Sequence, residues 1–156
     1  MSSTQDNYRK DAHIYEYGSA ANPTMAPIPV LAHPPELHET GPSRILPFDL
    51  SRHMEICDGP ATSPNLMASF VRIVEGDSIA TQATATSQAF YVIRGNGTST
   101  SEEHGTMEWS TGDMMVLPVT PGEVTHACTT AENGGAALYW IHDQPLLDYL
   151  GVLPSG

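Results

Sequence analysis

The stretch GDSIATQATATSQAFYVIRGNG, from Gly76 to Gly97, decides the fold. Its second half is an apolar, β-branched and aromatic run that leads directly into a Gly-Asn-Gly turn. Downstream, the runs GTMEW, MMVLP and AALYWIHD follow the same pattern, with Gly, Pro, Asp or Asn between them. Short strands separated by turn residues about every eight to twelve positions predict an all-β sandwich or barrel.

The same texture extends upstream and ends in a short helical tail. The runs SRILPFDL and LMASFVRIVEG read as strands, and DGPATSPN between them reads as a turn. The closing segment QPLLDYLGV places Leu146, Leu147 and Leu150 on one helical face, which is typical of a segment that caps a core. We therefore expect a single barrel domain over residues 45–156, tail included.

Residues 1–44 are expected to form an extended arm. The segment from Asn22 to Pro42 contains six prolines in 21 residues. Each proline fixes φ and removes a backbone donor, so neither an amphipathic helix nor a central strand is compatible with this density. The arm could be a disordered spacer, or its apolar residues could lie along a surface.

The amino-acid composition limits which binding partners and which cellular compartment are expected. The 156 residues carry a formal net charge of −12, so nucleic acid and anionic membranes are not expected as partners. No run of about 18 apolar residues predicts a membrane span, and the N-terminus lacks the apolar core of a secretory signal. Cys57 and Cys128 form no metal-binding or redox motif, so we expect structural cysteines in a cytoplasmic protein.

The order of these elements resembles the cupin family. The strand that ends in Gly-Asn-Gly, the later GDMMVLP segment and the VTHA segment before ALYWIHD follow the order of the two cupin motifs. Within that family the chain looks most like ring-cleaving dioxygenases of gentisate type. The resemblance covers roughly residues 66–143 and implies a single double-stranded β-helix, or jelly-roll, barrel. In such enzymes Fe(II) is held by histidines and a carboxylate, with open positions for oxygen and substrate.

The first cupin motif has lost its ligands in this chain. Counting back from Gly95, the family's glutamate falls on Gln88, and its His-x-His pair falls on Gln82 and Thr84. A longer spacer would move the pair to Thr81 and Ala83. Neither register supplies a histidine. Amides and hydroxyls are weak neutral donors, so this set makes a poor iron site.

The second motif retains its histidine at His126, which is thus the only one of the four ligand positions to match. His126 could be a leftover side chain satisfied by the barrel lining, or a pocket residue that acts as an acid or base near neutral pH. His104 reads as a turn residue, and His142 as a hydrogen-bonded structural residue. The remaining candidates are the histidines of the arm and early strands (His33, His38, His53) and nearby acids at strand entries or loops (Asp77, Glu102, Glu103, Glu123).

These observations predict a polar barrel lining without a metal, with Gln82, Thr84, Gln88 and His126 as candidate pocket residues. By resemblance and size, the chain looks like the small subunit of a hydroquinone dioxygenase whose larger cupin subunit carries Fe(II). We expect hetero-oligomers with that subunit, self-association being a further option, and an arm from Asn22 to Pro47 that lies across the partner. Two alternatives stay open, namely a stand-alone enzyme that uses His126 and a cupin module that binds a small molecule.

Overall fold

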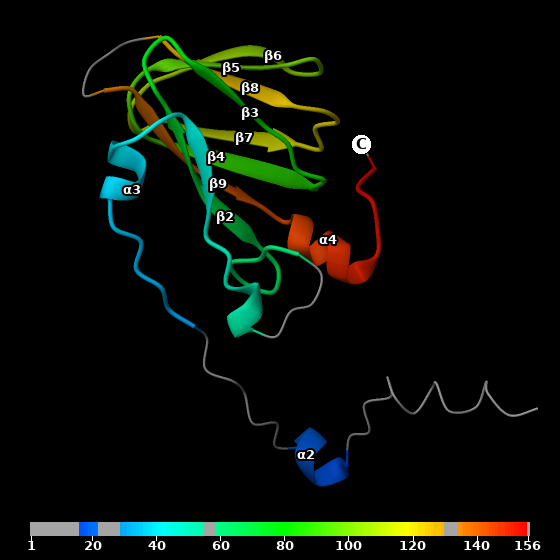
Figure 1. The fold of residues 1–156 in the computed structure, drawn as a ribbon. Coiled ribbons are helices and arrows are strands. Elements are labelled where there is room, and N and C mark those ends of the chain that lie inside the picture. The colour runs from blue at the N-terminus through cyan, green and yellow to red at the C-terminus, as the bar shows by residue number, and fades with distance from the viewer. Residues whose placement is uncertain (1–15, 22–28, 55–58, 130–133, 156) are drawn as a thin grey trace, which may run out of the picture.

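A computed structural model describes residues 16–21, 29–54, 59–129 and 134–155, and these form two facing antiparallel sheets (Figure 1). The first sheet has the order β1-β2-β9-β4-β7 and the second has the order β3-β8-β5-β6. The first contains β1 (Arg44–Pro47), β2 (Met67–Ile73), β4 (Ser87–Arg94), β7 (Met114–Pro118) and β9 (Ala136–His142). The second contains β3 (Ser78–Thr81), β5 (Gly97–Ser101), β6 (Gly105–Trp109) and β8 (Val124–Cys128). The predicted all-β fold is confirmed.

Helix is confined to short pieces in the described residues. These are α2 (Tyr17–Ala21), α3 (Glu36–Glu39), the 3-10 turn η1 (Ser51–His53) and α4 (Gln144–Leu150). The tail forms α4 as expected, with Leu147 buried and Leu150 exposed. Gly151 ends this helix in the left-handed conformation at φ 64°, a common stop signal. No helix in the described parts of the chain is long and apolar enough to cross a membrane.

The core lies between the two sheets, where the strands turn alternate side chains inward. In β4, Phe90 and Val92 are fully buried, whereas Tyr91 between them is exposed. The same cluster includes Leu138 of β9, the central strand of this sheet, and Val71 of β2 beyond it. Full burial of such side chains contributes roughly 1.5–3 kcal/mol each, so this layer is the main source of stability. Cys128 is also buried there, and Cys57 lies outside the described residues.

Both glycines of the Gly-Asn-Gly turn lie so close to neighbouring groups that neither position has room for a side chain. Gly95 has φ +88°, and a Cβ built on it would lie 2.8 Å from the Cα of Ala136. Gly97 has no such positive φ, but a Cβ there would lie 2.1 Å from the carbonyl oxygen of Ala127 and 2.5 Å from the Trp109 ring. Because the Ala127 carbonyl oxygen belongs to the backbone, it cannot move aside as a side chain could. The turn thus brings β5 against β8 and seats Trp109 over it.

Replacing Gly97 with Ala should therefore destabilise the domain by at least about 3 kcal/mol, the upper range for overpacking a close-packed site. Urea denaturation followed by circular dichroism measures the loss. Gly18→Ala is the matched control, because nothing lies within 4 Å of a Cβ at that position. Equal unfolding midpoints for the two variants would contradict this account of the turn.

The last part of the predicted arm lies on the chain's own first sheet. We call residues 34–44 the strap. Arg72 of β2 donates hydrogen bonds to the carbonyl oxygens of His38 (3.0 Å) and Gly41 (2.8 Å), and Arg94 of β4 also donates to His38. The His38 ring meets Phe70 edge-on with centroids 4.6 Å apart. The buried Arg72 guanidinium depends on these acceptors, so the strap is part of the domain.

The strap continues directly into β1, whose first residue is Arg44. Upstream of the strap, His33 stacks on Phe48 with centroids 4.0 Å apart, while Val30 and Leu31 are exposed. Residues 1–15 and 22–28 lie outside the described residues, so the expected path of the arm before Pro29 stays a prediction.

Candidate functional site in the barrel interior

His126 is the centre of a polar group inside the barrel. It lies in the middle of β8, opposite Ile79 of β3 and Ser99 of β5, and its side chain is fully buried. The Oγ1 atom of Thr81 lies 2.9 Å from Nε2 of the imidazole. The Oγ atom of Ser99 lies 2.7 Å from Nδ1. Both ring nitrogens of His126 are thus engaged by hydroxyl groups.

The direction of the hydrogen bonds follows from the two ends of the group. At one end, the indole N–H of Trp109 donates to Ser99 Oγ at 2.9 Å, which leaves the serine hydroxyl proton for His126 Nδ1. At the other end, Thr81 Oγ1 lies 3.5 Å from the carbonyl oxygen of Val124, to which it can donate its own proton. Thr81 then accepts from His126 Nε2–H. Only this neutral tautomer turns all four contacts into hydrogen bonds at once.

The surroundings of His126 oppose its protonation. Burial lowers the pKa of its imidazole to about 4, because little water is present to solvate the cation. The Phe90 ring, 4.7 Å from the imidazole between centroids, covers another side of it with apolar surface. His126 is therefore neutral at pH 7 and does not change its protonation state near that pH.

Gln88 lies in a second polar contact on the facing sheet. Its side chain is buried, and its Oε1 accepts a hydrogen bond of 3.0 Å from the indole N–H of Trp140. Trp140 in turn stacks in parallel with Phe90, with centroids 5.8 Å apart. Phe90 thus packs against both polar groups, and no hydrogen bond joins Gln88 to His126.

Gln82 and Thr84 lie outside the barrel interior. The register that aligns them with the His-x-His pair of the cupin motif would have pointed them inward. The chain alternates after β3 so that Thr81, Ala83 and Ala85 are buried, while Gln82 and Thr84 are exposed. The second register, with the pair at Thr81 and Ala83, is thus the one that points inward. A shift of one residue reverses every side chain of an extended segment, which explains the difference.

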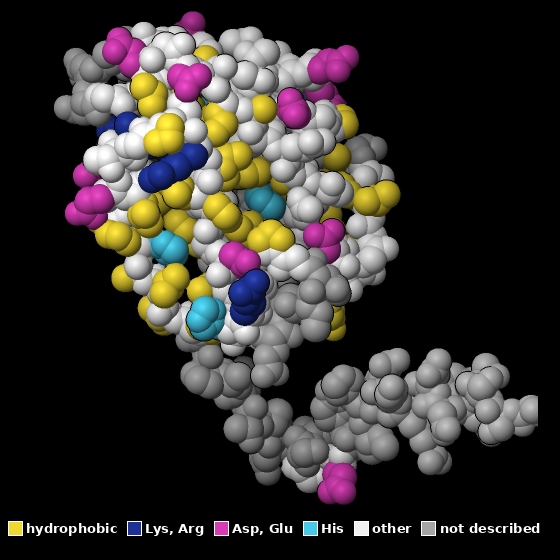
Figure 2. Space-filling model, in the orientation of Figure 1, with side chains coloured by type: hydrophobic (Ala, Val, Ile, Leu, Met, Phe, Trp, Pro, Cys, Tyr) yellow, Lys and Arg dark blue, Asp and Glu magenta, His cyan; other side chains and the backbone are white. Residues whose placement is uncertain are grey.

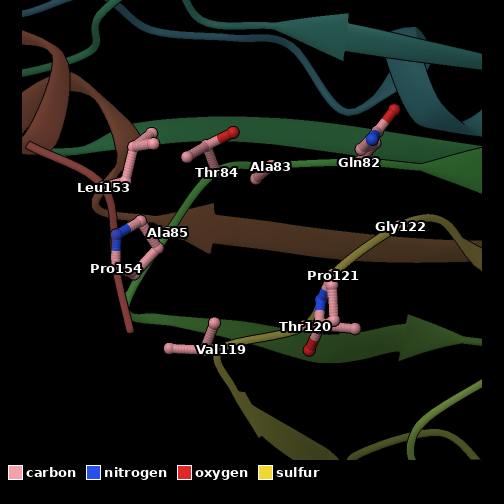
Figure 3. Close-up of a pocket in the computed structure, with 10 residues that line it drawn as sticks. All are labelled: Gln82, Ala83, Thr84, Ala85, Val119, Thr120, Pro121, Gly122, Leu153 and Pro154. Carbon is pink, nitrogen blue, oxygen red and sulfur yellow. The ribbon is translucent and has the colours of Figure 1, made fainter. Parts of the chain in front are cut away.

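The exposed positions line a surface cavity of about 220 Å³ beneath the C-terminal tail (Figure 3). Gln82, Thr84 and the loop after β7 form two of its walls, and Leu153 and Pro154 close it from the tail. The two interior candidates, Gln88 and His126, are not among its lining residues. Of the four candidate residues, two therefore line a cavity and two are enclosed in the core.

A second cavity, of about 210 Å³, opens at the end of the barrel near α4. His142, Trp140 and Ser69 form its inner wall, and Gln82 lies at its side. Burial lowers the pKa of His142 to about 4 despite the nearby Asp143, so this imidazole is also neutral at pH 7. The sequence predicted a structural role for His142 and did not predict that it lines a cavity. The placement of His142 on β9, two positions from Trp140 on the same face, is the signal that could have shown it.

The other residues considered from the sequence lie apart from these groups. His104 is in the turn between β5 and β6, half-buried, with Nε2 3.1 Å from the Thr120 hydroxyl. His53 is exposed at the end of η1. The acids near the motifs are all exposed: Asp77, Glu102, Glu103 and Glu123. The sequence reasoning missed Ser99 and Trp109, although the alternation GTSTS in β5 indicates inward serines.

The donor set at the position of the cupin metal does not fit Fe(II). It offers a neutral imidazole with both nitrogens already bonded, the Thr81 hydroxyl and the methyl group of Ala83. Gln88 adds an amide oxygen that is bonded to Trp140. Non-haem Fe(II) sites are typically built from two or more imidazole nitrogens with free lone pairs, commonly together with a carboxylate. Among the described residues, no group of three or more His, Cys, Asp or Glu side chains could hold a metal ion.

Comparisons with known families and with curated proteins give no match, whereas solved structures do. A variant of salicylate 1,2-dioxygenase from Pseudoaminobacter salicylatoxidans aligns with a TM-score of 0.52 and 21% identity, covering 69% of this chain. The chain has the cupin fold. Another variant of the same dioxygenase, in complex with gentisate, aligns over 60% of the chain with a TM-score of 0.49 and 26% identity. KdgF from Halomonas sp. aligns over 53% of this chain and 72% of its own, with a TM-score of 0.43 and 20% identity.

The chain spans only 28% and 24% of the two dioxygenase chains. The alignment thus corresponds to part of those proteins and leaves most of their length without a counterpart here.

The burial of His126 makes the stability of this cupin domain depend on pH. The folded domain keeps the imidazole neutral down to about pH 4, whereas the unfolded chain protonates it below about 6.5. The resulting stability, about 3 kcal/mol, is present in full above pH 6.5 and is lost as the pH falls to 4. Urea denaturation of the wild type and of His126→Gln should show the wild-type advantage shrinking by this amount between pH 7.5 and 4. The exposed His53→Gln serves as control, and an advantage that does not change with pH would contradict the prediction.

Proposed function

We propose that this chain is a metal-free cupin subunit of a heteromeric Fe(II) dioxygenase that cleaves hydroquinone- or gentisate-type rings. In this proposal a larger cupin subunit carries the iron and performs the chemistry. The observation that carries the proposal is the position of His126, whose two ring nitrogens are bonded to Ser99 and Thr81. In this barrel, hydrogen-bonded hydroxyl groups occupy the position at which a cupin metal would bind. Such a barrel is better suited to a scaffold role than to iron catalysis.

Two further observations support a partner role. The sequence resemblance points to ring-cleaving dioxygenases of gentisate type. Its buried histidines His126 and His142 are both neutral at pH 7 and therefore poor proton relays. Function of the isolated chain would thus lack both a metal and an evident acid–base group.

The proposed contact between the arm and the larger subunit involves fewer arm residues than the sequence suggests. Residues 34–47 lie on the chain's own sheet as the strap and β1, and the Arg72 guanidinium holds them there. The segment before them exposes two large apolar side chains, Val30 at 92% and Leu31 at 54%. We therefore assign the contact with the larger subunit to residues up to Leu31. Proline in this segment lowers the entropy that must be lost on docking.

Co-expression with a candidate large subunit tests this function. The two chains should elute together in size exclusion, and ring cleavage of hydroquinone or gentisate should require the large subunit with Fe(II). This chain alone should be inactive with the same metal and substrates. Ring cleavage by the isolated chain would overturn the subunit role and favour the stand-alone enzyme.

The same assay applied to truncated chains tests the arm. Removing residues 1–31 should leave the domain folded, because His33 and the strap are retained, and should weaken association by about 2 kcal/mol or more, as for loss of a buried anchor. Removing residues 1–43 should in addition destabilise the domain, because Arg72 would lose the carbonyl groups of His38 and Gly41. Unchanged assembly of the shorter truncation would show that the arm makes no such contact.

The cavity near α4 favours a second function, that of a small-molecule-binding cupin. Its volume of about 210 Å³ is below that of drug-sized pockets but is large enough for a single small ring, and Trp140 lies beside His142 and Ser69 in its walls. Under this alternative, hydroquinone or gentisate should raise the melting temperature of the isolated chain without turnover. In that case this chain should not elute together with a large subunit in size exclusion.

A further inference from the structure

Two polar side chains in the wall of the cavity near α4 have free hydrogen-bonding groups. Ser69 of β2 is 2% exposed and His142 of β9 is 8% exposed, and both line this cavity. Among the described residues, neither the Ser69 hydroxyl nor Nε2 of His142 has a hydrogen-bond partner, and both atoms are open to the cavity. Buried polar groups are nearly always hydrogen-bonded, so only a molecule inside the cavity can satisfy these two.

The hydrogen bond at the other side of the His142 ring fixes the role of its free nitrogen. The backbone N–H of Gln144 donates to Nδ1 of His142 at 3.4 Å. Burial lowers the pKa of this imidazole to about 4, so the ring is neutral at pH 7 and carries its one proton on Nε2. The Ser69 hydroxyl can donate or accept. The inner wall thus offers one fixed donor and one group that can take either role.

The sheet register places these two groups on either side of an apolar ring. Ser69 lies opposite Trp140, and Met67 lies opposite His142, so Ser69 and His142 are diagonal neighbours on the inward face. Such neighbours are about 7–8 Å apart. The Trp140 indole N–H already donates to Gln88, so Trp140 offers the cavity only its ring. A flat ring with hydroxyl groups at two positions suits this arrangement.

No positive charge lies in the described wall of this cavity. The wall contains no Lys or Arg, and its one charged residue is the acid Asp148. A second acid near His142, Asp143, accepts hydrogen bonds from Thr86. In Figure 2, acidic side chains are spread over the side in view and Lys and Arg side chains are few, as expected at a net charge of −12. A carboxylate in the cavity would lose water without gaining a cation.

We propose that this cavity binds a small uncharged ring that carries hydroxyl groups, and that it excludes the carboxylated form of the same ring. One ligand hydroxyl accepts from Nε2–H of His142, and a second forms a hydrogen bond with Ser69. The volume of about 210 Å³ is sufficient, because benzene fits an apolar cavity of about 150 Å³.

This site is separate from the position of the cupin metal. The residues that occupy that position, Thr81, Ala83 and His126, are not among those that line the cavity. The inference rests on the small-molecule-binding alternative above, to which it adds the charge and the polar groups of the ligand. It requires no iron and no larger subunit.

Calorimetric titration of the isolated chain at pH 7.5, without oxygen, tests the charge selectivity. Hydroquinone is uncharged at this pH, because phenolic hydroxyls titrate near pH ~10. Gentisate adds a carboxylate, and the primary amide of gentisic acid matches gentisate in size without its charge. Hydroquinone and the amide should bind at least about tenfold more tightly than gentisate. Equal binding of gentisate and the amide would overturn the proposal, and so would a failure of all three to bind.

Substitutions of the two polar groups test how the ligand is held. Ser69→Ala should weaken hydroquinone binding about threefold to tenfold, as for the loss of one hydrogen bond. His142→Phe retains a ring without the donor and should have a similar effect, which covers the case that the first variant does not fold. Ser87→Ala is the matched control, because Ser87 is exposed and does not line the cavity. Folded variants that bind hydroquinone as tightly as this control would contradict the assignment.

Gln82→Arg tests the charge argument in the opposite direction. Gln82 is exposed and lines this cavity, so a guanidinium there should strengthen gentisate binding about threefold or more and change hydroquinone binding little. Thr84→Arg is the matched control, because Thr84 is also exposed but lines the cavity beneath the tail and not this one. An equal effect of the two variants on gentisate binding would show that the cavity does not select by charge.

These outcomes separate this inference from the proposed functions. Equal binding of gentisate and its amide would remove this inference and leave the small-molecule-binding alternative in place. A failure of all three ligands to bind would remove both. Neither result bears on the subunit role, which the co-elution and ring-cleavage assays test.

Discussion

The hydrogen bonds of the buried His126 imidazole constrain the interior of this barrel. A polar ring enclosed between two sheets costs free energy unless each nitrogen has a partner, and Ser99 and Thr81 provide those partners at 2.7 Å and 2.9 Å. Trp109 completes the set by donating to Ser99. Gly97 in turn must lack a side chain so that Trp109 can lie across it. The turn, the indole, the serine and the histidine are therefore one dependent arrangement.

The exterior of the first sheet follows from a different constraint. Its outward side chains are largely apolar, and the strap covers one half by means of Arg72 and Arg94, which donate to strap carbonyl groups. The other half leaves Tyr91, Met114 and Val116 exposed. The chain thus covers its first sheet unevenly, whereas its interior is filled and neutral.

The sequence predicted the fold well because strand periodicity and turn residues are local signals. Phe90, Tyr91 and Val92 alternate in direction as a strand followed by Gly95 should. The segment from Ala80 to Ser87 was harder, because it contains only Ala, Thr, Gln and Ser and offers no large apolar side chain to mark the inward face. Its register could be assigned only from the structure, which places Thr81 rather than Gln82 beside His126. The strap was missed for another reason, since its bonds join residues 31 or more positions apart.

The state of the His126 ring nitrogens tests the central claim most directly. Nitrogen NMR of the imidazole, with Fe(II) or Zn²⁺ added to the isolated chain, reports the tautomer, the protonation state and any metal bond together. The account predicts a neutral ring protonated at Nε2, unchanged from pH 8 to 5 and unaffected by equimolar metal, with metal content far below one per chain. A ring that titrates near neutral pH, or a tight one-to-one metal that shifts its nitrogens and disappears in His126→Ala, would contradict it.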